Sequence, residues 1–354
     1  MKKETRKKLS EEMLFSEWNQ YWLSLVQYRL RITTLKRYEE AFDAIIDPAF
    51  QGKRICDISD EMAQEFFNQL REEGISVARC SSVLAIAKLS LDYALNRKLI
   101  RYNPFALVQL PRKFKKKTAI LYDDDIRKLF EEYETNPFLP LFAVILLCGL
   151  RIGEALGLTW NKVDLHEKTV EISQQLISYR ENGEQVYRIV PYTKNGEVRI
   201  LCLPEIAAEW LIRQKELQEQ MKRESSQWDT DMNLVFSDEN GDFMKYHQAR
   251  YQFKKIMDEI GRSDVTLHSL RHTAAATVLY TTGDIAAQQR FLGHRSALTS
   301  RRYGDATLEA QRRFADAIDA AFAEICAEGL GIELTEEIKE RLRRIREQGA
   351  TSYD

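Results

Sequence analysis

The stretch "FLPLFAVILLCGLRIGEALGLTW" (residues 138–160) decides the fold of this 354-residue chain. Its first part, residues 138–150, is almost wholly apolar, yet it is shorter than the roughly 20 residues that a membrane-spanning helix needs. It also contains a proline and a glycine. We therefore expect residues 138–150 to form a helix buried in the core of a globular domain, with Arg151 directly after it.

On the C-terminal side of this stretch, we expect a small antiparallel sheet within a mostly helical domain. Segments rich in β-branched residues surround two turn signals, "ENGEQ" (181–185) and "KNGE" (194–197), and the second has the form of a tight hairpin. The expected strands are residues 168–173, 186–194 and 197–204. Helical periodicity then returns in residues 205–224, 246–260, 269–281, 284–292 and 298–303, followed by a long tail from residue 307.

On the N-terminal side, the apolar residues follow a helical period in four blocks before a basic linker. The blocks are residues 15–26, 33–46, 60–70 and 76–100. The linker, "LPRKFKKKTAI" (110–120), leads into a further helix at residues 122–133, whose first turn holds three aspartates that suit the positive end of a helix dipole.

The fold class expected from these patterns is mainly α with a small antiparallel β-sheet. The expected boundaries are a helical domain at residues 12–110, a linker at 111–118, a mixed α/β domain at 119–306 and a helical tail at 307–354. The linker residues expected to contact nucleic acid are Arg112, Lys113, Lys115, Lys116 and Lys117.

The charge of the chain is unevenly distributed, although its net value is only −2. Residues 1–117 hold 22 basic and 15 acidic residues, a net charge of +7. Residues 118–354 hold 30 basic and 39 acidic residues, a net charge of −9. A basic front half fits a DNA-binding protein, but solvated helix faces can give the same totals.

The sequence gives no sign of a disulfide framework, a metal site or a nucleotide cofactor. Its five cysteines are odd in number and never form a C-x-x-C pair, and no G-x-G-x-x-G, G-x-x-x-x-G-K-[ST] or H-E-x-x-H motif is present. His268 and His272 have a metal-compatible spacing, but no carboxylate or cysteine nearby completes a ligand shell. We expect no cofactor, no metal and no membrane segment. The cysteine pattern also predicts a reducing cytoplasm as the location of the chain.

Arg271 is the strongest candidate for binding an anion, because the planar guanidinium matches phosphate oxygens and stays charged. If the anion is a phosphodiester, His268, one helical turn earlier, could donate a hydrogen bond to it. Each candidate also has an ordinary structural role open to it. Arg151 could simply pair with Glu154, Lys194 could be a solvated lysine beside an Asn-Gly turn, and Tyr303 could be an inert surface tyrosine.

The order of these residues along the chain resembles the catalytic set of the tyrosine recombinase (phage integrase) family, which includes integrases of phages and conjugative transposons. The matching residues are Arg151 in "GLRIGEALGL", Lys194 in "PYTKNGEVRI", His268 and Arg271 in "HSLRHT", His294 in "LGH", and Tyr303. The resemblance covers roughly residues 12–325, because the N-terminal helices and the "NP" that follows them resemble the family's core-binding domain. Gly304-Asp305 follows the tyrosine where family members often have Thr-His.

The resemblance implies a SAM-like core-binding domain and a catalytic domain that together form a C-shaped clamp on DNA. It implies that Tyr303 attacks the scissile phosphate, giving a 3′-phosphotyrosyl linkage and a free 5′-hydroxyl, without ATP. Arg151, Arg271 and His294 would stabilise the charge that develops on the phosphate oxygens.

The resemblance also implies how protons move during the reaction. Lys194 would protonate the leaving 5′-oxygen, and His268 would assist proton transfer at the tyrosine. Glu154 would orient the guanidinium of Arg151 from behind.

The implied partners are double-stranded DNA target sites and further copies of the chain, as a monomer or dimer on single sites and a tetramer in the synapse. The resemblance also implies that the protein integrates and excises a mobile element, and an accessory excision factor is a possible further partner in that reaction. The amphipathic tail (307–326) is expected to dock on a neighbouring protomer, with core packing in its own chain as the alternative. The other functions left open are a type IB topoisomerase and a non-catalytic DNA-binding regulator.

Overall fold

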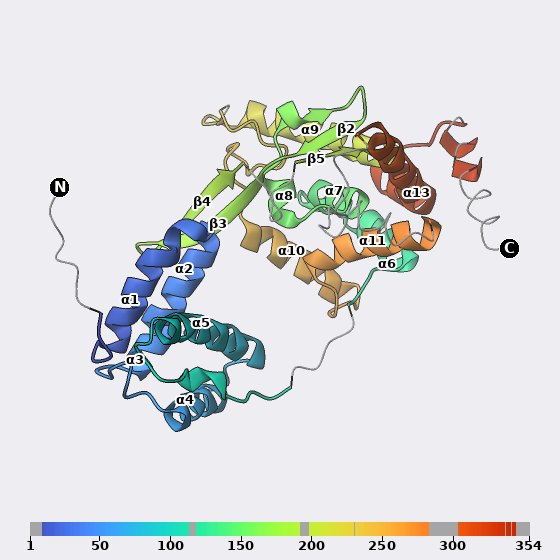
Figure 1. Ribbon diagram of the computed structural model, residues 1–354. Helices are drawn as coiled ribbons and strands as arrows, with labels where there is room; N and C mark the ends of the chain where they lie inside the picture. Colours follow the sequence, from blue (N-terminus) through green and yellow to red (C-terminus); the bar gives the residue numbers. More distant parts are fainter. Residues whose placement is uncertain are drawn as a thin grey trace. The chain divides into compact units, whose positions relative to one another are not determined.

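The structure, a computed structural model, describes residues 9–112, 118–191, 198–229, 231–282, 304–336, 338–340 and 342–344 (Figure 1). Of residues 282 and 304–310 it describes the backbone but not the side chains. The chain divides into two compact units. The first comprises Met1–Lys116 and Ser178–Val186, and the second comprises Lys117–Ile177 and Tyr187–Asp354. Among the described residues, no helix is both long and apolar enough to cross a bilayer.

The first unit is a helical bundle, as the periodicity predicts. Its α-helices are α1 (Phe15–Val26), α2 (Ile32–Ala41), α3 (Asp47–Ala49), α4 (Asp60–Glu72) and α5 (Val77–Asn96), with a π-helical turn at Phe42–Ile46. Ser59 and Ser76 cap α4 and α5, because each side chain accepts a hydrogen bond from a backbone N–H in the first turn. Aromatic side chains such as Trp18, Phe67 and Phe105 fill the core.

A buried polar network ties the helices of this bundle together. Asn19, which is fully buried, donates from Nδ2 to Asp47 Oδ1 at 2.8 Å and accepts from Ser90 Oγ at 2.7 Å. The indole of Trp18 donates to the backbone carbonyl of Ser90 at 3.2 Å. Burial raises the pKa of Asp47, although the hydrogen bond from Asn19 acts in the opposite direction.

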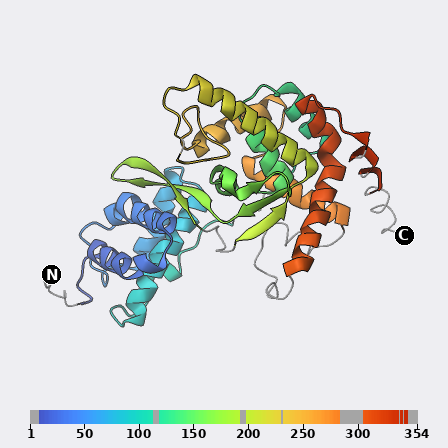
Figure 2. The ribbon, with the colours of Figure 1, turned by 90° about the horizontal axis from the view of Figure 1, so that it is seen from above.

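The second unit is built around α7 (Leu139–Cys148), in which all ten residues are buried. This confirms the expected core helix. It ends at Gly149, whose φ of 60° is the left-handed conformation that favours glycine. Helices that pack around α7 are α9 (Glu205–Glu224), α11 (Leu267–Thr282) and α13 (Gly304–Leu330), and further helices of the unit are α6 (Asp123–Glu132), α8 (Ile152–Leu156) and α10 (Tyr246–Glu259) (Figures 1 and 2).

The strands form two small sheets rather than the single sheet expected from the sequence. Strands β1 (Val163–Asp164), β2 (Thr169–Ile172) and β5 (Arg199–Cys202) form an antiparallel sheet in the order β1-β2-β5, with Val170 opposite Leu201. Strands β3 (Gln175–Glu181) and β4 (Glu184–Val190) form a separate pair. The strands β1 and β3 are missing from the sequence prediction.

The hairpin lies at the first of the two Asn-Gly turns. Asn182 and Gly183 join β3 to β4 with φ values of 51° and 85°, the pair of positive values that a type I′ turn requires. The second turn, at 194–197, lies outside the described residues. The expectation that the segments on either side of it pair with each other is wrong for β4 and β5, because β4 belongs to the β3-β4 pair and β5 to the β1-β2-β5 sheet. That pairing depends on contacts distant in sequence, which turn residues do not reveal.

Helix α13 packs within its own chain. It lies beside α6, α9 and α11 (Figure 2). Its residues Phe314, Ile318, Phe322 and Ile325 are buried. The buried carboxylate of Asp319 caps the N-terminus of α9, accepting from the backbone N–H groups of Glu205 and Ile206 at 2.7 and 3.1 Å. Core packing within the same chain, the alternative stated above, thus describes Gly304–Leu330 here, and the contact with a neighbouring protomer stays a prediction.

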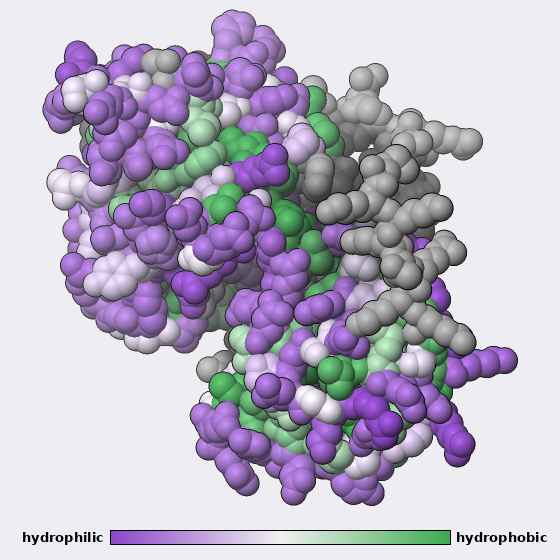
Figure 3. Space-filling model, turned by 90° about the vertical axis from the view of Figure 1, so that its left-hand side faces the viewer, coloured by the Kyte–Doolittle hydropathy of each residue, from purple (hydrophilic) through white to green (hydrophobic). Residues whose placement is uncertain are grey.

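Most apolar side chains thus lie in the two cores. On the face drawn in Figure 3, hydrophilic residues cover most of the surface, and apolar residues reach it in smaller patches between them.

Candidate active site

Arg151 and Glu154 meet at the start of α8, directly after the buried helix α7. The backbone N–H of Arg151 donates to Glu154 Oε2 at 2.9 Å, and Arg151 Nη1 donates to Glu154 Oε1 at 2.7 Å. The side chain of Glu154 has no exposed surface, whereas that of Arg151 is 19% exposed. The predicted pairing of these two residues is therefore present.

The glycines of the "GLRIGEALGL" stretch bring α8 close to strand β3. A Cβ atom at Gly153 would meet the backbone oxygen of Leu176 at 2.9 Å, and one at Gly157 would meet its backbone nitrogen at 2.5 Å. Any side chain at these positions would push α8 off β3, and would displace Glu154 with it. The small residues therefore serve backbone packing.

Arg271 approaches the same carboxylate from α11. It is 3% exposed, donates from Nη1 to the backbone oxygen of Gly149, and lies with Nη1 4.0 Å from Glu154 Oε2. Helix α11 is fixed against the core by buried residues on both sides of Arg271, including Leu270 and Ala274. Two of the residues predicted from sequence, Arg151 and Arg271, are thus brought together although 120 positions separate them in the chain.

His268 lies one turn before Arg271 and is exposed, with its ring centroid 4.5 Å from that of His272. Burial, and then the charge of Arg271, lower the pKa of His272. Across the described residues, no group of three or more His, Cys, Asp or Glu side chains could hold a metal ion.

A third arginine, Arg199 of β5, belongs to the cluster and is missing from the sequence prediction. Its Nη1 and Nη2 donate to Glu154 Oε1 and Oε2 at 3.1 and 2.7 Å, a two-bond geometry that gives arginine–carboxylate pairs their strength. The alternation of side chains along β5 could have identified Arg199 from the sequence. Arg199 shares a face with the buried Leu201, whereas Ile200 between them is 52% exposed, so a charged side chain faces inward and needs a partner.

The cluster has more positive than negative charge. Three guanidinium groups surround one carboxylate, so two positive charges remain in excess. Burial raises the pKa of Glu154, but the hydrogen bonds and charges of Arg199 and Arg151 outweigh it and lower the pKa to about 2. Burial, with repulsion from Arg151 and Arg199, lowers the pKa of Arg271 to about 9 against the opposing effect of Glu154. An oxyanion bound here would offset this repulsion.

The other predicted site residues cannot be placed in this geometry. Lys194, His294 and Tyr303 lie outside the described residues, as do the linker residues Lys113, Lys115, Lys116 and Lys117. Arg112 is exposed. Tyr303 directly precedes Gly304, the first residue of α13.

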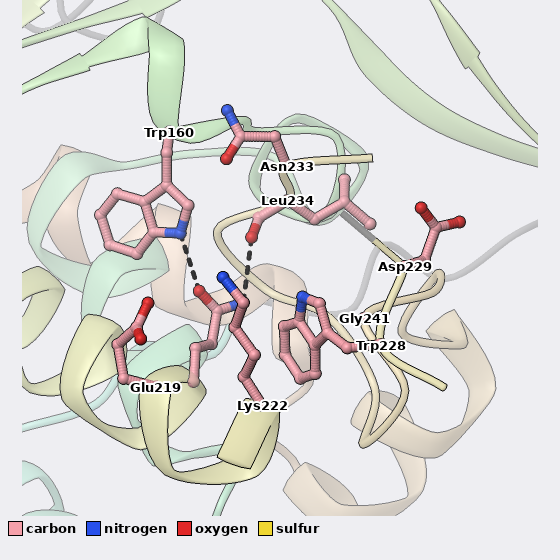
Figure 4. Close-up of a pocket in the computed structure, with 9 residues that line it drawn as sticks. Trp160, Glu219, Lys222, Trp228, Asp229, Asn233, Leu234 and Gly241 are labelled. Carbon is pink, nitrogen blue, oxygen red and sulfur yellow. Dashed lines mark hydrogen bonds between the residues drawn. The ribbon is translucent and has the colours of Figure 1, made fainter. Parts of the chain in front are cut away.

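A small pocket elsewhere in the second unit contains none of the predicted site residues. Its volume is about 100 Å³, enough for about three water molecules, and it lies beside α9 (Figure 4). Within it, Trp160 Nε1 donates to Gln218 Oε1 at 2.7 Å, and Gln218 Nε2 donates to the backbone oxygen of Leu234 at 2.9 Å. These bonds tie α9 to the segments on either side, which indicates a structural role.

Comparison with known proteins identifies the family of the chain and agrees with the fold. Residues 119–309, more than half of the chain, match the phage integrase family, and residues 14–71 match the phage integrase N-terminal SAM-like domain. The chain belongs to the phage integrase family of tyrosine recombinases, whose members are site-specific DNA recombinases.

Individual relatives are similar over most of their length. The XerC-like tyrosine recombinase of Caldanaerobacter subterraneus subsp. tengcongensis is 24% identical over 290 residues, which cover 77% of this chain and 74% of the relative. The tyrosine recombinase XerC of Bacillus subtilis is 24% identical over 294 residues, covering 80% and 83%.

Among solved structures, the Tn1549 transposon integrase in complex with a circular intermediate DNA has a TM-score of 0.64 and 20% identity, covering 78% of this chain and 91% of that one. A lambda integrase tetramer bound to a Holliday junction has a TM-score of 0.57 and 14% identity, covering 84% of each chain. These likenesses show that the fold is shared.

Proposed function

We propose that this recombinase cleaves and rejoins DNA through a 3′-phosphotyrosyl intermediate, with Tyr303 as the nucleophile, and that it integrates and excises a mobile element. The observation that carries the proposal is the convergence of the partly exposed Arg151 and the buried Arg271 on the single carboxylate of Glu154. A cluster with excess positive charge, partly open at Arg151, suits a phosphodiester oxygen.

In this mechanism, Tyr303 Oη attacks the scissile phosphorus, the bond to the 5′-oxygen breaks, and that oxygen leaves with a proton from Lys194. His268 assists proton transfer at the tyrosine. Arg151 and Arg271 donate to the non-bridging oxygens as negative charge develops on them, and His294 adds a further hydrogen bond. Religation reverses the step when a 5′-hydroxyl of the partner strand attacks, so the energy of the phosphodiester is kept.

The partners in this proposal are double-stranded DNA sites and other copies of the chain, with a tetramer forming at synapsis. The basic residues of the linker and the first unit contact the DNA backbone, and the reaction takes place in the bacterial cytoplasm. Two relatives of the same fold are described in complexes of this kind, the transposon integrase on circular intermediate DNA and the lambda integrase tetramer on a Holliday junction.

A nicked suicide substrate tests the proposal. The nick near the cleavage site lets the short strand with the free 5′-hydroxyl diffuse away, so a covalent protein–DNA adduct accumulates and survives SDS. We expect the wild type to form this adduct, and Tyr303→Phe to bind DNA without forming it. Tyr280→Phe, at a side chain that is 84% exposed, is the matched control and should behave as wild type. An adduct formed by Tyr303→Phe would assign the nucleophile elsewhere.

A further inference from the structure

Arg199, a largely buried charged side chain of the second unit, has no role in the mechanism above. Its side chain is 13% exposed, and both terminal nitrogens of its fork are engaged by Glu154. Its Nε is buried and has no hydrogen-bond partner among the described residues. A buried arginine that leaves one donor unpaired is costly, so the two bonds to Glu154 must compensate for it.

The bonds around Glu154 are divided unequally among the three arginines. Arg199 contacts both carboxylate oxygens, Arg151 makes one side-chain bond at 2.7 Å, and Arg271 Nη1 remains 4.0 Å away. A carboxylate that is not neutralised would compete with a phosphate for the same guanidinium groups, because both are oxyanions that accept from the arginine fork. The site therefore needs a cationic side chain that pairs with Glu154 and does not itself bind the scissile phosphate.

We propose that Arg199 is a positioning residue for the recombination reaction. It binds Glu154 through two hydrogen bonds and holds that carboxylate at the N-terminus of α8. The carboxylate is thereby kept from drawing Arg151 and Arg271 away from the scissile phosphate. Its place at the start of β5 also ties the β1-β2-β5 sheet to the arginine cluster. This inference rests on the proposed function of Arg151 and Arg271.

A lysine cannot replace Arg199 in this role. Its ammonium is a point charge and cannot present two parallel N–H groups to the two oxygens of Glu154. Methionine keeps much of the length of the side chain but removes the charge. We therefore expect the wild type to cleave fastest, Arg199→Lys more slowly and Arg199→Met most slowly.

The test measures single-turnover adduct formation on the nicked substrate at saturating protein, together with DNA affinity and thermal unfolding. We expect Arg199→Met to slow adduct formation roughly 10- to 100-fold, by analogy with the loss of a residue that orients a metal ligand. DNA affinity should change much less than the rate. Arg223→Met, at an exposed arginine near the end of α9, is the matched control and should cleave as wild type.

The double variant Arg199→Met/Glu154→Gln separates positioning from simple loss of structure. If Arg199 acts through Glu154, removal of both partners leaves no competing carboxylate, and the double variant cleaves no more slowly than Arg199→Met. Rate losses that multiply in the double variant would overturn the inference, as would an Arg199→Met variant that cleaves at the wild-type rate. If Arg199→Met fails to fold, Arg199→Lys alone and combined with Glu154→Gln gives the same comparison. A wild type that forms no adduct would instead contradict the proposed function.

Discussion

The two units each contain a buried polar network, and the two networks differ in charge balance. In the first unit, Asn19, Ser90 and Asp47 satisfy one another with a single carboxyl group among neutral partners. In the second unit, Glu154 faces three arginines. The first network is complete without a ligand and serves stability, whereas the second has an excess of charge that an anion would neutralise. Substitutions in the two networks should therefore have different consequences.

The largest expected difference is in catalysis. Arg271→Ala should lower the rate of adduct formation about 10³-fold, the effect of losing an arginine at a phosphoryl transition state, while DNA binding persists. Asn19→Ala removes a buried polar side chain of the first unit and should leave the cleavage rate of bound complexes unchanged. Single-turnover kinetics on the nicked substrate measures both. An equal loss of rate in the two variants would remove the distinction between the networks.

Substitutions in either polar network should lower the free energy of unfolding, and the loss should be larger in the second unit. Glu154→Gln leaves three guanidinium groups without a counter-charge, and removal of one partner from a buried ion pair costs about 3–5 kcal/mol. Ser90→Ala leaves the amide oxygen of Asn19 without its donor and should cost about 1–3 kcal/mol. Urea unfolding of the two variants, followed separately for each unit, gives both values. A smaller loss for Glu154→Gln than for Ser90→Ala would contradict the account.

Acid should act on the two networks with opposite signs. The pKa of Glu154 is lowered from 4.5 to about 2 in the folded chain, so its stabilisation is present above pH 4.5 and is lost as the pH falls toward 2. The pKa of Asp47 is raised from 3.8, so protonation of this group favours the folded state as the pH falls. The stability gap between wild type and Glu154→Gln should therefore narrow between pH 5 and pH 3, and a gap that stays constant would show that Glu154 does not titrate as described.

The smallest expected effect is that of metal removal. Because arginines, a lysine and histidines supply the positive charge in the proposed mechanism, adduct formation should continue at the same rate in excess EDTA. Loss of cleavage in EDTA that magnesium restores would require a metal in the site.

The sequence predicted what local patterns determine. Helix α9 was expected at the residues where it occurs, and the buried helix α7 followed from an apolar run with a glycine at its end. The pairing of β5 with β2 could not be predicted in this way, because these strands meet across the hairpin of β3 and β4.

The candidate site shows the same division. The pair Arg151 and Glu154 is three residues apart, within reach of sequence reasoning, whereas Arg199 meets Glu154 from 45 positions away. The amphipathic face of α13 fits a neighbouring protomer and its own core equally well as a pattern. The structure shows Phe314 and Ile318 packed into the core of the same chain, and a contact of the tail with a neighbouring protomer stays a prediction.

The central claim is that Arg151 and Arg271 neutralise the charge of the scissile phosphate, and a substrate with a methylphosphonate at that position tests it most directly. This group has a methyl in place of one non-bridging oxygen and carries no charge, so an arginine that serves to neutralise the charge of the phosphate loses its importance. We predict that Arg271→Ala, which is slowed about 10³-fold on the normal phosphate, recovers most of that loss on the methylphosphonate. An Arg271→Ala variant that is impaired equally on both substrates would contradict the account, because its arginine would then act on the fold rather than on the phosphate.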